Sequence, residues 1–392
     1  MLFRNFRFSS LFGLAALFSA LIPGGLSADN TGRALNANVP GLENATSAQV
    51  VRAMGLGWNL GNTMECCGDW IKGGEVRNFE TAWGNPETTQ EMIDKVKAAG
   101  FRSVRIPVAW SNLMGADTTI DPRLLERVKQ IVDYVLRDGM IAMVNIHWDG
   151  GWWSKFPTDY KGSMARYTRM WSQIAGYFRN YPCTLVFESL NEEGSFNDVW
   201  NQYGPPAPEK KKAAFDILNR INQAFVDLVR SSGGFNAKRH LLIAGYATNI
   251  DHTTDPFFRM PRDPQNHCIV SVHYYTPPTF CILDKDAEWG KVRKTWGTSA
   301  DFDELDANLG KLKARFLDHG VPVIVGEYGA SQKNKDPKSV RLFLLSVAGK
   351  FYAAGMCPML WDAGGFLDRK IPEFRDPELM RGYQKILSAK RD

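Results

Sequence analysis

Residues 185–192 read LVFESLNE, and residues 323–329 read VIVGEYG. Each is a short apolar run, typical of a buried strand, that leads into a glutamate, Glu192 in the first and Glu327 in the second. Six further runs of this kind occur along the chain, at residues 56–60, 103–106, 141–146, 241–244, 269–272 and 359–361. Together with 185–187 and 323–325, they predict eight strands.

Helix-like segments alternate with these runs, at residues 88–99, 122–137, 165–180, 213–231, 303–319 and 338–354. Several are followed by a glycine, as helices often are, at Gly100, Gly139, Gly320 and Gly355. Eight strands that alternate with helices predict an α/β fold, a single-domain (β/α)8 TIM barrel over residues 47–392. A doubly wound sheet is the alternative, but no G-x-G-x-x-G opens a helix after the first strand. The polar stretch 195–209 is expected to be a long loop.

The N-terminus predicts export. Arg4 and Arg7 precede an apolar stretch at residues 11–22, which small residues follow at 24–28, so residues 1–28 resemble a signal peptide. An uncleaved membrane anchor is the alternative, although the stretch is short for a span. Residues 29–46 are then a polar lead-in, and we expect a secreted protein that has no membrane contact after signal cleavage.

The amino-acid composition limits the kinds of molecule that the protein can bind. The formal net charge of +5 over 392 residues, without a basic run, argues against nucleic acid. The 12 Trp and 12 Tyr are more informative, because their amphipathic rings stack well on sugar faces. Six cysteines at irregular spacing, with no C-x-x-C, argue against a structural zinc site, and we expect mostly free or singly paired thiols. We expect a monomer without cofactor or metal.

Chemistry-bearing residues gather where the predicted strands end. In a barrel these ends meet at one face, where catalytic residues stand. Charged side chains have no reason to collect there in a plain core, since buried charge is costly unless it is paired. Two carboxylates on different strands suit a retaining glycosidase, in which an acid protonates the leaving oxygen and a nucleophile attacks the sugar. The residues in question are Arg105, His147, Asn191, Glu192, His273, Tyr275, Glu327 and Trp361.

Several motifs, in order, carry a family resemblance. They are GWNLGNT at 57–63, TAWGNP at 81–86, VHYYTP at 272–277, GEYG at 326–329 and LWDAGG at 360–365. With them the chain resembles glycoside hydrolase family 5 (cellulase family A) from about residue 48 to 381. It is most similar to the branch with broad endo-β-1,4-glucanase and xyloglucanase activity.

The resemblance implies a role for each matching residue. Glu192 would be the acid/base, with a pKa raised by nearby Glu327, and Glu327 would be the nucleophile, kept ionised by Arg105. Tyr275 would donate to the nucleophile, and Asn191 would bind the sugar 2-hydroxyl. His147 and His273 would line the pocket. Sugar contacts are expected from Trp361 as a stacking floor, and from Asn62, Trp83, Trp148 and Trp289.

Further aromatic residues could pave the groove, namely Trp110, Trp152, Trp153, Trp200 and Trp296, or they could be core. Glu65, Glu80 and Asp149 read as solvated or supporting acids. The chain departs from the family pattern at Glu193, where the family often has Pro, and at Trp148, where it often has a second His. Glu193 either raises the pKa of Glu192 or points to solvent.

The paired glutamates predict a retaining glycosidase, and the resemblance implies an endo-β-1,4-glucanase whose partner is a β-1,4-linked glucan: cellulose-type, mixed-linkage or xyloglucan. Three alternatives stay open. The protein could be a hydrolase of the same fold that acts on mannan or xylan. It could bind β-glucan with a catalytically inactive site, or it could be a metal-dependent hydrolase.

Overall fold

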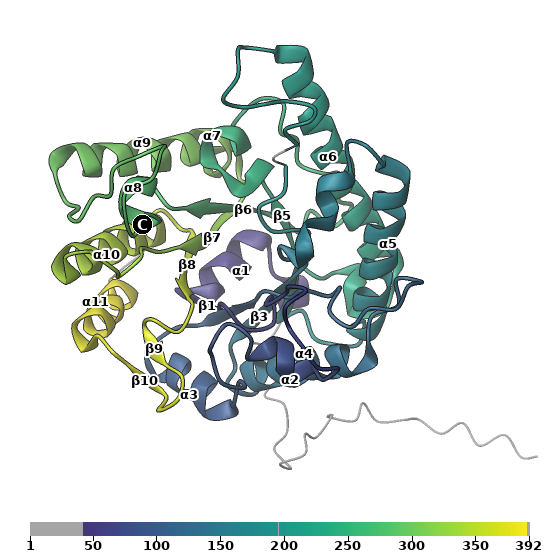
Figure 1. Cartoon of the computed structure of the whole chain (residues 1–392), viewed down its shortest axis with the longest axis horizontal. Coiled ribbons are helices and arrows are strands. Elements are labelled where there is room, and N and C mark those ends of the chain that lie inside the picture. The colour runs from purple at the N-terminus through teal and green to yellow at the C-terminus, as the bar shows by residue number, and fades with distance from the viewer. Residues whose placement is uncertain (1–41, 195, 390–392) are drawn as a thin grey trace, which may run out of the picture. The chain divides into compact units, whose positions relative to one another are not determined.

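The computed structural model describes residues 42–194 and 196–389, so the expected signal peptide lies outside the described residues. Within this part, eight parallel strands close into a barrel in chain order, as predicted (Figure 1). Closure comes from β1, whose Gly57 lies opposite Ser103 of β2 and Met359 of β8. The strands are β1 (Gly57–Leu60), β2 (Ser103–Ile106), β3 (Ile141–Asn145), β4 (Leu185–Glu188), β5 (Leu241–Ala244), β6 (Cys268–Tyr274), β7 (Val323–Tyr328) and β8 (Cys357–Asp362).

Helices surround the strands (Figure 1). The larger ones follow the predicted segments within a few residues: α3 (Gln90–Ala98), α4 (Pro122–Arg137), α5 (Tyr160–Tyr177), α6 (Pro208–Ser231), α9 (Ser299–Arg315) and α10 (Pro337–Ala353). Shorter or unpredicted helices are α1 (Ser47–Met54), α2 (Val76–Glu80), α7 (Ile250–Thr253), α8 (Pro278–Cys281) and α11 (Pro377–Ser388). No helical segment was predicted between β5 and β6, and the described helices there are the short 3-10 helix Tyr246–Thr248 and the one-turn α7. The connection from β4 to α6 is the long loop expected there.

Local signals explain why these helices form where they do. In α4 the side chain of Asp121 accepts a hydrogen bond from the backbone N–H of Arg123, and Pro122 occupies the first turn. Its buried residues recur at helical spacing, from Leu124 through Val128 to Val135, and form one apolar face toward the strands.

Strand alternation divides the core into two clusters. Outward-facing residues such as Val144 and Phe187 pack under the helices, while inward-facing residues such as Met143 and Val186 fill the barrel. The N-terminal end of this interior is closed by α1, which places Val50, Val51 and Met54 in the inner cluster. Figure 1 shows α1 at the centre of the barrel.

A polar layer lies above this inner apolar core, toward the C-terminal ends of the strands. It contains the fully buried side chains of Asn59, Arg105, Asn145, Glu188 and Ser271, from β1, β2, β3, β4 and β6. Because these residues sit at inward positions, their charges and amides must pair with one another. The polar layer forms the base of the site described next.

No disulfide joins the six cysteines, all of which fall within the described residues. Among residues 42–194 and 196–389, no helix has the length and apolar character needed to span a membrane.

Candidate active site

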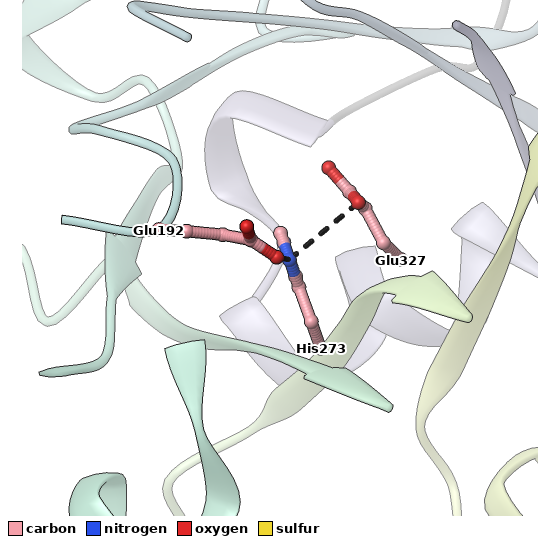
Figure 2. A group of neighbouring side chains, drawn as sticks. All are labelled: Glu192, His273 and Glu327. Atoms are coloured by element: carbon pink, nitrogen blue, oxygen red, sulfur yellow. Dashed lines mark hydrogen bonds and ion pairs between the residues drawn. The ribbon is translucent and has the colours of Figure 1, made fainter. Parts of the chain in front are cut away.

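The two predicted catalytic glutamates lie together at the C-terminal face of the barrel. Glu327 belongs to β7 and is buried, and Glu192 follows β4 with its side chain 50% exposed. One oxygen of each carboxyl group and Nδ1 of His273 all lie within 4.8 Å of one another. His273 Nδ1 donates to Glu192 Oε1 at 2.7 Å and lies 3.6 Å from Glu327 Oε2 (Figure 2). The imidazole of β6 therefore bridges the two carboxyl groups.

Arg105 holds Glu327 as predicted. Its Nη1 donates to Glu327 Oε1 at 2.7 Å, and its Nη2 donates to Asn191 Oδ1 at 2.7 Å. Tyr275 donates its hydroxyl to the other oxygen of Glu327 at 2.9 Å. With Oδ1 of Asn191 occupied, the amide nitrogen of that residue is the group it can offer to a sugar in the cleft.

Sequence reasoning missed Glu188, although it stands in the opening motif at residues 185–192. Arg105 Nε donates to Glu188 Oε2 at 2.7 Å, and Asn145 Nδ2 donates to the same oxygen at 3.0 Å. Ser271 donates to Glu188 Oε1 at 2.7 Å. The signal that could have revealed it is strand alternation, because Glu188 shares the inward parity of Val186.

The two glutamates differ in proton affinity, and in an order opposite to the expected one. Burial raises the pKa of Glu327 above its ordinary value, and the charges of His273 and Arg105 offset this only in part. Burial also acts to raise the pKa of Glu192, but the hydrogen bond and charge of His273, with Arg105, outweigh it and lower that pKa. The expected rise at Glu192 is wrong for the open cleft, because the imidazole donates to Glu192 rather than to Glu327.

His147 lines the cleft from the end of β3 and is buried. Its ring stacks on that of Trp361 with centroids 5.8 Å apart and planes 8° from parallel. Burial lowers the pKa of His147 well below its usual value, and the charges of Arg105 and His273 act in the same direction. The neutral form of His147 is therefore favoured, and its ring can exchange hydrogen bonds with a sugar beside Trp361.

The site opens into two adjoining cavities. The first, about 630 Å³, is lined by Glu327, His147, Asn191 and Trp361, among others. The second, about 460 Å³, is lined by residues of the α7 and α9 segments. Glu192, Tyr275 and Ile282 line both cavities, whereas Glu327 lines only the first. Glu192 thus stands at the boundary between them.

The predicted sugar-contacting aromatic residues separate into exposed and buried groups. Trp148 and Trp289 are 51% and 60% exposed, Trp83 is 39% exposed, and Trp361 is partly exposed in the first cavity. Of the two possibilities left open for the further tryptophans, groove or core, the core is correct for Trp110, Trp153, Trp200 and Trp296. Asn62 is partly exposed but does not line either cavity; its backbone N–H donates to Glu65.

Three acids near the motifs are buried and hydrogen-bonded rather than solvated. Glu80 pairs with Arg127 at 2.8 Å. Glu65 accepts from the backbone N–H groups of Asn62 and Thr63, and burial raises its pKa to about 7. Asp149 accepts from Ser111 and from Trp152, and burial raises its pKa to about 6.

Glu193 does not point to solvent, because it is buried, and it lines neither of the two cavities. Its side chain accepts the backbone N–H of Asn191, and burial raises its own pKa well above the ordinary value. It closes the turn that carries Asn191 and Glu192.

Among the described residues, Glu192, His273 and Glu327 are also the group whose atoms could converge on a metal ion. Each of these side chains already has a hydrogen-bonding or ionic partner within the trio or from Arg105 and Tyr275. This arrangement of donors and acceptors suits proton transfer and nucleophilic attack by carboxylates.

Known proteins share this architecture. The family model described as cellulase (glycosyl hydrolase family 5) matches residues 67–365. Endoglucanase A of Paenibacillus barcinonensis is 33% identical over 395 residues, which cover 92% of each chain. A xyloglucan-specific endo-beta-1,4-glucanase of Bacteroides ovatus is 34% identical over 83% of this chain and 66% of that one.

Solved structures agree with the sequence relatives. A GH5-4 broad specificity endoglucanase from an uncultured bovine rumen ciliate superposes with a TM-score of 0.79 at 34% identity, over 88% of this chain and 99% of that one. A GH5 family lichenase from Caldicellulosiruptor sp. F32 gives a TM-score of 0.80 at 33% identity, over 88% and 96%. The chain therefore belongs to glycosyl hydrolase family 5, the cellulase family, and is a glycoside hydrolase.

Proposed function

We propose that this protein is a secreted, retaining endo-β-1,4-glucanase that cuts the backbone of β-glucans by double displacement. One observation carries the proposal: oxygens of Glu192 and Glu327 lie within 4.8 Å of each other, with Arg105 and Tyr275 on Glu327 and His273 on Glu192. Inverting enzymes need about 6.5–9.5 Å between the carboxyl groups to admit a water, whereas retaining enzymes need about 5–5.5 Å. The 4.8 Å limit applies to one oxygen of each group rather than to the whole carboxyl groups, and it suits the closer, retaining arrangement.

In the first step Glu327 attacks the anomeric carbon and forms a glycosyl–enzyme ester, while the bond to the leaving oxygen breaks. Glu192 gives its proton to that oxygen, so the leaving sugar departs as a neutral alcohol. Arg105 and Tyr275 orient the attacking carboxylate. The Asn191 amide is placed to hydrogen-bond the 2-hydroxyl, a contact that strengthens as charge develops in the transition state.

In the second step Glu192, now ionised, takes a proton from water, and that water attacks the anomeric carbon and releases Glu327. The His273 hydrogen bond favours the ionised form of Glu192, which suits this step. For the first step Glu192 must be protonated. A sugar that covers its half-exposed carboxyl removes water from it and moves its pKa upward.

The two cavities receive different parts of the substrate. The nucleophile must face the sugar that is retained, and the acid must face the oxygen that leaves. The first cavity, which contains Glu327 and Trp361, therefore takes the glycone, with Trp361 as its stacking floor. The second cavity, which Glu192 but not Glu327 lines, takes the leaving-group side. A cleft that continues on both sides of the cleavage point suits attack within a polymer.

Glucan is the substrate class that the relatives favour. Matched proteins are named endoglucanases and a xyloglucan-specific glucanase, and one matched lichenase variant is in complex with cellotetraose. Trp148, Trp289 and Trp83 are exposed and suit stacking on further sugars, and the partly exposed Asn62, in the loop after β1, can offer a hydrogen bond. Mannan and xylan remain the alternative backbones for the same machinery.

Secretion rests on the sequence of residues 1–28. Expression of the full chain in a secreting host, followed by N-terminal sequencing of the protein in the medium, tests it. A mature N-terminus near residue 28 or 29 supports export and cleavage, and retention of Met1 on a cell-bound protein contradicts it.

The function is tested by reducing-sugar release from carboxymethylcellulose, mixed-linkage β-glucan, xyloglucan, mannan and xylan. Wild type should act on the glucans, and Glu327→Ala should lose about a thousandfold or more, because the covalent step is removed. The control is Glu209→Ala, which removes an exposed glutamate from the first turn of α6 and should keep full activity. Binding without cleavage by wild type would favour the dead-site alternative, and preference for mannan or xylan would replace the glucan assignment.

A further inference from the structure

The guanidinium of Arg105 is shared by two buried carboxylates. Its Nη1 bonds Glu327, the proposed nucleophile, and its Nε bonds Glu188 at the same distance of 2.7 Å. The side chains of Arg105 and Glu188 are wholly inaccessible, and that of Glu327 is 6% exposed. Glu188 does not line either of the two cavities, so it cannot touch the sugar there.

The geometry fixes the guanidinium plane from its Nε edge. Glu188 Oε2 accepts both from Arg105 Nε and from Asn145 Nδ2, and Glu188 Oε1 accepts from Ser271. Three strands other than β4 thus hold this carboxylate, through β2, β3 and β6. Once Nε is fixed, the planar fork of the guanidinium directs Nη1 and Nη2 in set directions.

Both Nη groups contact residues of the proposed catalytic machinery. Nη1 bonds Glu327 and also Asn59 at 3.1 Å, and Nη2 bonds Asn191, the neighbour of the acid/base. A rotation of the guanidinium would therefore displace both the nucleophile and the amide proposed to read the 2-hydroxyl. Small misplacements of reacting groups are costly in rate.

We propose that Glu188 is a positioning residue for this reaction: it anchors the Nε edge of Arg105 and divides the positive charge of Arg105 between two carboxylates. The inference rests on the proposed function for the identity of the nucleophile. If Arg105 paired with Glu327 alone, its full positive charge would stabilise the ionised form of Glu327 more strongly. The carboxylate would then be a weaker nucleophile. Glu188 keeps Glu327 oriented without this full neutralisation.

Four charged or titratable groups act on the proton affinity of Glu327, and any test must keep their identity constant. They are Arg105 of β2, Glu192 after β4, His273 of β6 and Tyr275 after β6. Substitution of Glu188 alone changes none of these four residues.

The decisive variant is Glu188→Gln, which keeps the shape and removes the charge. The readout is the pKa of Glu327 itself, followed by carboxyl ¹³C NMR in protein labelled at glutamate side chains and assigned with Glu327→Gln. Without the competing carboxylate, Arg105 should lower the pKa of Glu327 below its wild-type value. This measurement needs no turnover, so its result stands apart from success or failure of the glucanase assignment.

Activity gives the second readout. The acid limb of kcat/KM for an aryl β-cellobioside should move down in pH in Glu188→Gln, and kcat should fall roughly 10- to 100-fold because the fork is released. Ser271→Ala is the matched control, because it removes one hydrogen bond from Glu188 and keeps its charge, so the acid limb should not move. A purely structural Glu188 would change stability and leave the acid limb in place.

If Glu188→Gln fails to fold, Glu188→Asp decides. Aspartate keeps the negative charge, but its shorter side chain moves the carboxylate away from Arg105 Nε. The guanidinium is then no longer anchored, so kcat should fall at least roughly tenfold with little change in KM. An unmoved pKa of Glu327 in Glu188→Gln, or an unchanged kcat in Glu188→Asp, would overturn the proposal.

Discussion

The imidazole of His273 donates to Glu192 at 2.7 Å, although it also lies 3.6 Å from Glu327. This hydrogen bond acts on Glu192, while burial is the strongest influence on Glu327. It lowers the pKa of Glu192 against the effect of burial, while the pKa of Glu327 stays raised.

Removal of His273 should therefore shift the pH profile upward. In His273→Ala the lowering influence on Glu192 is lost, so its pKa rises and the alkaline limb of kcat/KM moves to higher pH. The charge of His273 also lowers the pKa of Glu327, so the acid limb moves in the same direction. The profile of kcat/KM with an aryl β-cellobioside measures both limbs. Limbs that stay where they are in wild type would contradict the assigned hydrogen bond.

Glu192 should be dispensable when the leaving group needs no proton. Glu192→Ala should lose about 10²- to 10⁴-fold on β-glucan, where a sugar alkoxide would have to leave. On a dinitrophenyl β-cellobioside the formation of the glycosyl–enzyme should be much less affected, as measured by the burst of released dinitrophenol. An equal loss on both substrates would argue that Glu192 is not the acid.

Glu65 should make the protein less stable as pH rises. Its pKa is about 7 in the fold against an ordinary value of 4.5, so the folded state binds more protons than the unfolded state between these values. The stability is therefore fully present below about pH 4.5 and falls toward pH 7, by up to roughly 3 kcal/mol. Urea unfolding at several pH values gives the free energy of unfolding as a function of pH. This free energy should fall less steeply with pH in Glu65→Gln than in wild type. Glu209→Gln, at an exposed position, should keep the wild-type slope.

Trp148 should contribute to polymer binding. It directly follows His147, is half exposed and packs edge-on against Trp153, at the start of a loop in which Asp149, Gly150 and Gly151 all have positive φ. Trp148→Ala should raise KM several-fold on a glucan polymer, since an aromatic stacking contact is worth about 0.5–1.5 kcal/mol. Phe235→Ala is the control, because that exposed ring precedes β5 at the opposite end of the barrel. An equal effect in both variants would rule out a specific role for Trp148.

Chelation should leave activity intact. The carboxylates and the imidazole of the site already fill the roles of nucleophile, acid and hydrogen-bond donor. After dialysis against EDTA and then metal-free buffer, the rate on β-glucan should match that of untreated enzyme. A loss that Zn²⁺ or Mn²⁺ restores would support the metal-dependent alternative, with Glu192, His273 and Glu327 as the ligands.

The sequence predicted the barrel well, because apolar runs and helix signals are local. It also predicted that Glu192 and Glu327 would lie near each other at one face, and Arg105 and Tyr275 contact Glu327 as expected. It failed where the outcome depends on three-dimensional neighbours. The protonation order of Glu192 and Glu327 follows from which carboxyl group His273 reaches, and sequence spacing does not contain that information.

Burial of polar residues was the other failure. The sequence did not reveal that Glu188 and Glu193 are buried, because the residues around a carboxylate do not show which donors the fold brings to it. The sequence also left open whether Trp110, Trp200 and Trp296 face the groove or the core. They are buried in the core, and the sequence could not decide this because the exposure of a ring depends on what packs above it.

The most direct test of this account is covalent trapping of the nucleophile. Wild-type protein would be incubated with a 2-deoxy-2-fluoro-β-cellobioside bearing an activated leaving group, digested, and mapped by tandem mass spectrometry. The account predicts one fluorocellobiosyl ester, on Glu327, with loss of activity in step with labelling. Labelling of a different carboxylate, or full turnover of β-glucan without any trapped ester, would contradict it.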